Sequence, residues 1–212
     1  MRPRLRLPVQ LVNSGTQAVP DDAELMRAFS SGESWAARAI WRSYAPMVFR
    51  LLERALGPNG DAEDLTQDVF LSIFAKLGML RDSEALRSFI YSVAVRTLKW
   101  ELRRRRVRRI LHLSDDGRLP DLPVRGIDSE ARQTLARFYA LLERLSVNDR
   151  AAFVLRHMEG LKLDEIAERM GVSLATAKRW VSRASRDVSV LVESDPELSG
   201  QFGGRGGFHA RG

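Results

Sequence analysis

The sequence predicts an all-α protein with two small helical domains joined by a flexible linker, the second of them a helix-turn-helix domain. Apolar residues recur at helical spacing along most of the 212 residues, and no stretch alternates like a half-buried strand. A segment rich in Pro, Gly and Asp, residues 113–130, divides the chain. Near the C-terminal end, Gly171 stands between two short helical patterns, which is typical of a tight turn between helices.

Composition and charge exclude several classes of protein. With 44% hydrophobic and 29% charged residues, the chain is globular rather than disordered. It has no cysteine, which excludes disulfides, thiolate catalysis and zinc ribbons. No apolar run approaches the roughly 20 residues that span a bilayer. The formal net charge of +7 predicts an anionic partner, either nucleic acid or a membrane surface, and we expect no cofactor or metal.

Breaks in the helical pattern set the expected domain boundaries. The Arg-rich start is interrupted by prolines and lacks the apolar core of a signal peptide, so we interpret it as a tail. The last residues, QFGGRGGFHARG, are too glycine-rich to pack. We therefore expect a flexible tail (1–20), a first domain (21–112), a linker (113–128), a second domain (129–193) and a flexible Gly-rich tail (194–212).

Four helices are expected in the first domain. Asp21 and Asp22 open the first helix. The second covers residues 34–56 and ends before Gly57-Pro58-Asn59-Gly60, which breaks the chain. The third covers about 61–77 and the fourth about 83–111. The apolar positions of the first two helices are Leu25, Met26, Phe29, Trp35, Ile40, Tyr44, Val48, Leu51 and Leu52.

The third helix concentrates acidic residues in a basic chain, within the stretch DAEDLTQDVF. Asp61, Asp64 and Asp68 fall at steps of three and four, so they share one helix face, with Gln67 beside it. Such a face can dock on a basic partner surface. Favourable electrostatics at the helix N-terminus also explain the first acidic residues, but they account less well for Asp68, two turns in. From the residues alone, both explanations stay open.

The fourth helix combines an apolar face with a basic one. Leu86, Ile90, Val93, Leu98 and Leu102 are expected to face a core. Ser92, Arg96, Lys99, Arg103 and Arg106 form a stripe on the opposite side, widened by Arg104, Arg105, Arg108 and Arg109. The helix dipole stabilises each of these cations by only about 0.3–1 kcal/mol, whereas so dense a cluster repels itself unless an anion neutralises it. We therefore expect a phosphate backbone as its partner. Tyr91 and Trp100 are candidates either for stacking on bases or for the core.

The second domain contains LDEIAERMGVSLATAKRWVSRASRDV, from Leu163 to Val188, which has the pattern of a helix-turn-helix motif. We expect Gly171 to adopt a left-handed turn and Ser173 to cap the next helix. Small Ala167 allows the two helices to cross closely. In the second helix, Ala177, Val181 and Ala184 are expected to point inward, which leaves Thr176, Lys178, Arg179, Arg183 and Arg186 for solvent or a DNA major groove.

This order of an acidic helix, a basic helix, an acidic linker and a helix-turn-helix resembles the sigma-70 family of bacterial RNA polymerase initiation factors, in its small extracytoplasmic-function (ECF) group. The resemblance covers about residues 21–192. Its most specific segments are DAEDLTQDVF and LERLSVNDRAAFVLRHMEGLKLDEIAERMGVS with ATAKRWVSRA. It implies a non-catalytic, cytoplasmic protein, associated with the nucleoid when bound to polymerase, that directs core polymerase to promoters.

The resemblance also assigns roles to residues. Asp61, Asp64, Gln67 and Asp68 would bind the clamp helices of the largest polymerase subunit, while the flap of the second-largest subunit is a further contact. The promoter −10 region would meet Arg87, Tyr91, Arg96, Lys99, Arg103 and Arg106. The −35 region would meet Ser173, Thr176, Lys178, Arg179 and Arg183 as duplex. The linker would thread toward the active-site and RNA-exit channel, and an anti-sigma factor is a further candidate partner.

Several positions depart from the family pattern. Phe89-Ile90 stands where a Trp-Leu pair is usual, and Trp100-Glu101 stands where the family has an aspartate. An asparagine usual near Arg96 is missing, and a Thr-Val-Lys signature is Thr176-Ala177-Lys178. In this family a base of the non-template strand flips into a pocket of the domain that contacts the −10 region. Because of these changes, the resemblance does not specify the residues of that pocket or the promoter sequence preference of this chain.

Three other functions are considered. A conventional helix-turn-helix regulator would bind a palindromic operator as a dimer and has no need of the acidic face. A nucleic-acid enzyme would need a site that the three scattered histidines do not suggest, although Asp61, Asp64 and Asp68 could in principle hold magnesium. A membrane-surface role would need the apolar face of the basic helix, which is expected to lie in a core.

Overall fold

The computed structural model describes residues 20–57, 61–80, 85–111 and 129–202, and these ranges contain helices and no strand. This confirms the all-α prediction. No helix among the described residues is both long and apolar enough to span a membrane. The elements are α1 (Asp22–Ser30), α2 (Ser34–Leu56), α3 (Ala62–Leu77), α4 (Leu86–Leu111), α5 (Ser129–Leu142), α6 (Val147–Phe153), the π-helix η1 (Val154–Met158), α7 (Leu163–Met170), α8 (Leu174–Glu193) and α9 (Pro196–Phe202).

Helices α1–α4 form the first module. The carboxylate of Asp21 caps α1 by accepting a hydrogen bond of 2.7 Å from the backbone N–H of Glu24. Helix α2 has the predicted limits and ends at Gly57, whose φ of 85° suits a residue without a Cβ. The apolar residues predicted to bury one face of α4 are all buried. Trp35, however, is 39% exposed and lies at the surface.

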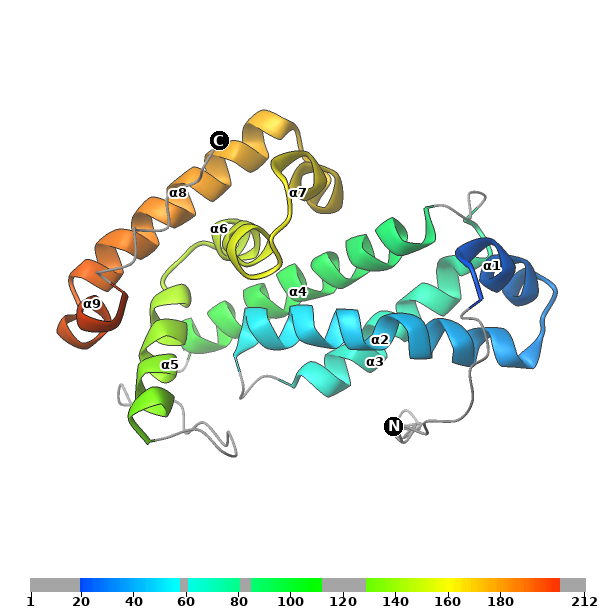
Figure 1. Cartoon of the computed structure of the whole chain (residues 1–212), viewed down its shortest axis with the longest axis horizontal. Helices are drawn as coiled ribbons and strands as arrows, with labels where there is room; N and C mark the ends of the chain where they lie inside the picture. Colours follow the sequence, from blue (N-terminus) through cyan, green and yellow to red (C-terminus); the bar gives the residue numbers. More distant parts are fainter. Residues whose placement is uncertain (1–19, 58–60, 81–84, 112–128, 203–212) are drawn as a thin grey trace.

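Helices α5–α9 form the second module, in which α8 crosses α6 and α7 and runs on toward α9 (Figure 1). Its own cluster of buried side chains lies between α5, α6, α8 and α9. The π-helix that continues α6 was not predicted. Such wide turns are rare and frequently occur at functional sites.

The expected flexible tail over 194–212 begins too early, because residues 196–202 form α9. The carboxylate of Asp195 accepts hydrogen bonds from the backbone N–H groups of Glu197 and Leu198, and Pro196 occupies the first helical position. Leu198 is fully buried, and Arg137 of α5 pairs with Glu197 at 2.8 Å. The prediction of a tail relied on the glycines further on and missed this cap. Residues 203–212, the expected linker 113–128 and nearly all of the expected N-terminal tail lie outside the described residues.

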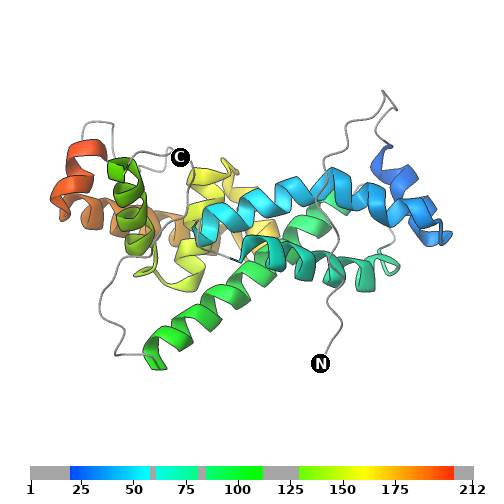
Figure 2. The ribbon, with the colours of Figure 1, turned by 90° about the horizontal axis from the view of Figure 1, so that it is seen from below.

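The two modules pack on each other along α4. Figures 1 and 2 show α6 and α7 lying against one side of α4, with α2 and α3 against another. A single cluster of buried apolar residues includes members of α1–α4 and of α6, α7 and α8. The predicted layout of two helical modules is confirmed. In this conformation, however, the two modules share one core, which the sequence did not predict.

Candidate nucleic-acid interface

The turn of the helix-turn-helix has the predicted local geometry. Gly171 lies in the left-handed region, at φ 66° and ψ 44°, and ends α7. The hydroxyl of Ser173 accepts a hydrogen bond of 3.3 Å from the backbone N–H of Thr176 and so caps α8. Val172 packs at the corner against the shared core. Both predicted turn residues thus fulfil their predicted structural roles.

Helix α8 buries one face and presents the other. Ala177, Val181 and Ala184 are fully buried, as predicted. Lys178 and Arg179 are exposed near the N-terminal end of the helix, and Thr176 is half-buried. The positive end of the helix dipole adds to these charges, so this end of α8 attracts phosphate.

Arg183, about one turn further along α8, forms a salt bridge within the protein. Its guanidinium donates hydrogen bonds of 2.9 and 2.7 Å to the two carboxylate oxygens of Asp149, which is buried in α6. The hydrogen bond with Asp149 holds the pKa of Arg183 above its ordinary value. The structure therefore gives Arg183 a role in fixing α8 to α6, while its DNA contact stays a prediction.

The second module covers part of the basic stripe of α4 and leaves the rest exposed. Arg87, Arg96, Arg103 and Arg106 are exposed. Lys99 is half-buried, with its ammonium 5.7 Å from the ring centroid of Trp180 in α8. Burial, and then the charge of Arg103, lower the pKa of Lys99. Four of the six predicted −10 residues therefore face solvent.

Tyr91 lies inside the contact between the modules and is 5% exposed. The guanidinium carbon of Arg169 in α7 lies 4.9 Å from its ring centroid, and its hydroxyl donates a hydrogen bond of 3.3 Å to Glu159. Glu159 also pairs with Arg54 of α2 at 2.9 Å. Burial, and then Glu159, raise the pKa of the Tyr91 hydroxyl. In this conformation the ring of Tyr91 is not available to DNA.

Glu101 pairs with several arginines in the C-terminal half of α4. The sequence did not identify it as a site residue. Its side chain is fully buried and accepts hydrogen bonds from Arg104 at 2.6 Å and Arg105 at 2.8 Å, with Arg108 at 3.7 Å. Burial raises the pKa of Glu101, but the hydrogen bonds from Arg104 and Arg105 outweigh it, so the pKa lies below its ordinary value. The spacing of three and four residues from Glu101 to these arginines is the signal that could have identified it.

The acidic residues of α3 lie at the surface. Asp61, Asp64 and Asp68 are exposed and Gln67 is half-buried. Among the described residues, no salt bridge involves these three aspartates. Leu71, three residues after Asp68, is 66% exposed on the same side of the helix. The predicted acidic face is therefore accessible and carries an apolar side chain at one end.

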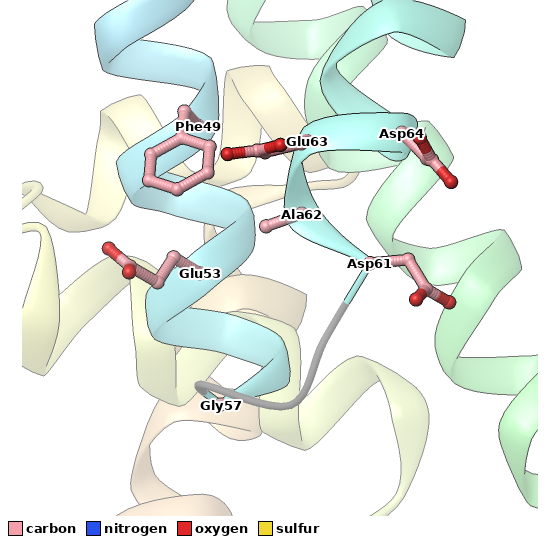
Figure 3. Close-up of a pocket in the computed structure, with 7 residues that line it drawn as sticks. All are labelled: Phe49, Glu53, Gly57, Asp61, Ala62, Glu63 and Asp64. Carbon is pink, nitrogen blue, oxygen red and sulfur yellow. The ribbon is translucent and has the colours of Figure 1, made fainter. Parts of the chain in front are cut away.

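A hollow between the end of α2 and the start of α3 extends this acidic surface. It is lined by Phe49, Glu53, Gly57, Asp61, Ala62, Glu63 and Asp64. In Figure 3, Glu63 points toward Phe49, while Asp61 and Asp64 point away from it on the other side of α3. Of the acidic residues in the lining, Glu63 points toward Phe49, so a cationic side chain placed in the hollow could pair with its carboxylate. In the described ranges, no three His, Asp or Glu side chains come together as a group that could hold a metal ion.

Comparison with known proteins agrees with both modules. The family model described as Sigma-70 region 2 matches residues 40–108, and the one described as Sigma-70, region 4 matches residues 135–188. The ECF RNA polymerase sigma factor SigM of Mycobacterium tuberculosis is 29% identical over 181 residues, which cover 85% of this chain and 89% of SigM. The ferric citrate uptake sigma factor FecI of Escherichia coli is 32% identical over 139 residues, covering 63% of this chain and 77% of FecI.

Solved structures show the same fold. CnrH, solved in complex with the cytosolic domain of CnrY, superposes with a TM-score of 0.57 at 20% identity and covers 82% of this chain and 98% of CnrH. The sigma factor RpoE of Bartonella quintana, solved with the anti-sigma factor NepR, gives a TM-score of 0.54 at 23% identity, with 73% and 95% covered. The family models and the relatives of similar sequence show that the chain belongs to the sigma-70 family, in its ECF group, whose members bind core RNA polymerase and promoter DNA to initiate transcription.

Proposed function

We propose that this sigma factor docks on core polymerase through α3, contacts the −10 element through α4 and reads the −35 element as duplex through α8. The observation that carries the proposal is the exposed acidic face of α3, Asp61, Asp64 and Asp68, in a chain whose formal net charge is +7. A conventional operator-binding regulator has no use for such a face. A sigma factor needs it to meet basic residues on the polymerase clamp helices.

The docking surface consists of the acidic face and the neighbouring hollow. Exposed carboxylates orient a partner and favour cationic surfaces more than they add affinity. Leu71 supplies an apolar contact that charges alone do not provide. Phe49, on the wall of the hollow, can pack against the stem of an inserted lysine or arginine.

The −35 element would be read by the N-terminal end of α8. Ser173, Thr176, Lys178 and Arg179 lie there, and in a helix-turn-helix the first turns of the second helix enter the major groove. Arginine and lysine in these turns can meet guanine edges or phosphates. Arg183 would contribute to DNA binding only alongside its pair with Asp149.

The −10 element would be contacted along α4. Arg87, Arg96, Arg103 and Arg106 are exposed, and phosphates are their natural partners. Tyr91 and Lys99, however, face α7 and α8 in this conformation. Promoter contact through these two residues therefore requires the second module to move off α4.

A protein inhibitor is a further candidate partner. The solved complexes of CnrH with CnrY and of RpoE with the anti-sigma factor NepR concern proteins of the same fold. We propose that a partner of this kind, if it binds this chain, binds with the two modules close together as they are here. It would then compete with polymerase for the same sigma factor.

The test is run-off transcription with purified core polymerase on promoter fragments from the chain's own genome. We expect wild type to start transcripts at defined sites. We expect Asp64→Arg with Asp68→Arg to lose initiation and core binding while keeping duplex binding through α8. Glu193→Arg is the matched control, because Glu193 is an exposed carboxylate of α8 that forms no salt bridge among the described residues.

Two results would contradict the proposal. If wild type binds DNA yet neither associates with core polymerase nor directs initiation, the chain acts as a conventional regulator. If the reversed pair keeps full core affinity, the docking site lies elsewhere on the chain.

A further inference from the structure

An acidic and a basic surface lie next to each other on the first module. Helices α3 and α4 pack together, and Asp61, Asp64 and Asp68 are exposed on α3. Arg104 of α4 lies at the border. Its hydrogen bond to Glu101 raises the pKa of Arg104 above the ordinary value, and the charges of Asp61 and Asp68 act in the same direction. The acidic face of α3 is therefore within electrostatic reach of the arginines of α4.

Large apolar side chains lie exposed among these charges. On α4, Trp100, which the sequence left open between a core and a stacking role, is 55% exposed, Val107 is 54% exposed and Leu111 is 76% exposed. Their spacing of seven and four residues places these three side chains in one row, the apolar row of α4. On α3, Leu71 ends the acidic face. Apolar side chains that are grouped at a surface and rimmed by polar ones mark a contact with another molecule.

Arginines line both sides of the apolar row. Arg104 and Arg108 pair with the buried carboxylate of Glu101, at 2.6 and 3.7 Å. Arg103 and Arg106 follow the other side of the row and are exposed. Neither of these two forms a salt bridge among the described residues. A partner of this half of the surface therefore combines acidic groups with an apolar one.

A second copy of this chain has that combination, because the acidic face of α3 carries Leu71. A surface with an acidic half beside a basic half is complementary to itself when a twofold axis runs between α3 and α4. The acidic half of one copy then lies over the basic half of the other, and the reverse contact forms at the same time. A DNA backbone is repelled by the aspartates at one edge of this surface, and a basic protein is repelled by Arg103 and Arg106 at the other.

We propose that two copies of this chain form a twofold dimer in which the acidic face of α3 of each copy packs on the apolar row and the arginines of α4 of the other. The dimer covers the surface that is proposed to dock on polymerase, so only the separated monomer binds core enzyme. This regulatory role rests on the proposed function, whereas the dimer itself does not. Dimer formation follows the chain concentration by mass action, so excess sigma factor withdraws itself from polymerase.

Analytical ultracentrifugation of the full-length chain over a range of concentrations measures the dimer. At about 0.15 M salt the Debye length of about 8 Å screens the repulsion between two basic chains but leaves charges in contact effective. One variant carries Asp64→Arg with Asp68→Arg, and the other carries Arg103→Glu with Arg106→Glu. We expect wild type to dimerise and each variant alone to dimerise at least about tenfold more weakly, because like charges then face each other. Mixed in equal amounts, the two variants should associate, since every contact between them again joins opposite charges.

Two further variants separate this contact from general effects. Val107→Glu places a carboxylate in the apolar row, opposite the acidic face of the second copy, and should weaken the dimer without loss of core binding. Asp164→Arg with Glu193→Arg makes the same change of net charge as the α3 variant, at exposed positions of the second module that form no salt bridge among the described residues. It should dimerise like wild type. Circular dichroism of each variant checks that its helices are retained.

The outcomes distinguish this inference from the proposed function. If wild type stays monomeric at every concentration while it binds core polymerase, the dimer is wrong and the proposed function stands. If wild type dimerises but the mixed variants do not associate, the dimer uses another surface and the inference is wrong. Core polymerase bound to an intact dimer would contradict the covering of the docking surface. If the dimer forms through these charges and wild type never binds core polymerase, the dimer stands and the proposed function falls.

Discussion

The guanidinium of Arg150 in α6 donates two hydrogen bonds, of 3.1 and 2.7 Å, to the carbonyl oxygen of Ala55 near the end of α2. The two residues are 95 positions apart and belong to different modules. The carbonyls of the last helical turn have no partner within their own helix, so Arg150 caps α2 from the second module. Burial lowers the pKa of Arg150 to about 10, which still leaves it charged at neutral pH.

We expect Arg150→Ala to lower the free energy of unfolding by about 1–3 kcal/mol, because it leaves a buried carbonyl without a donor. Urea unfolding followed by circular dichroism measures the change. Arg144→Ala is the control, since Arg144 is exposed and forms no salt bridge among the described residues. Equal stability of the two variants would show that this contact contributes nothing to the packing of the modules.

The two arginines of α8 should respond differently to removal. Arg183→Ala leaves the buried Asp149 without its bidentate partner, so we expect a loss of about 1–3 kcal/mol in the free energy of unfolding. Arg179→Ala should leave stability unchanged and reduce the salt dependence of duplex binding by about 0.9 in slope. Urea titrations and duplex binding at several salt concentrations check both. A stable Arg183→Ala, or an Arg179→Ala with an unchanged slope, would contradict the corresponding assignment.

Separation of the modules is testable with thiol chemistry, because the chain has no cysteine of its own. Ser88 of α4 donates a hydrogen bond to Glu168 of α7 across the contact. We expect Ser88→Cys with Glu168→Cys, bridged by a short bifunctional thiol reagent, to bind core polymerase through α3 but to fail in promoter opening. Each single-cysteine variant treated with the same reagent is the control. Full transcription by the bridged chain would show that Tyr91 stays covered during initiation.

The stability of the second module should depend on pH through His157. Burial, and then the charge of Arg156, lower the pKa of His157 below its ordinary 6.5. The unfolded chain therefore binds the proton more readily, and the stability that His157 contributes above about pH 6.5 is lost as the pH falls through and below that value. We expect unfolding free energies measured at about pH 7.5 and about pH 5.5 to differ less in His157→Gln than in wild type.

The glutamine keeps a polar group within reach of Ser185, whose hydroxyl lies 2.8 Å from the Nε2 atom of His157. Carboxylates that titrate at lower pH are common to both proteins and cancel in the comparison. An equal loss of stability in the two proteins would show that His157 does not sense pH in this range.

Local features of this chain could be predicted from the sequence because they depend on residues a few positions apart. The limits of α2 follow from the apolar period and the break at Gly57. The turn of the helix-turn-helix follows from Gly171 and Ser173, whose cap reaches only to Thr176. The acidic face of α3 follows from spacing alone, and its exposure follows because the apolar residues occupy the other side.

Only the tertiary structure decided what meets across the chain. Tyr91 and Trp100 are both aromatic residues of α4, yet the second module covers one and leaves the other exposed. Arg183 and Arg179 look alike in the sequence, but only Arg183 lies opposite the buried Asp149. A helical period states which residues share a face, but the burial of that face depends on partners far away in sequence. For this reason the sequence determined the elements and the candidate surfaces, and the packing of α4 against α6 and α7 decided which of them are accessible.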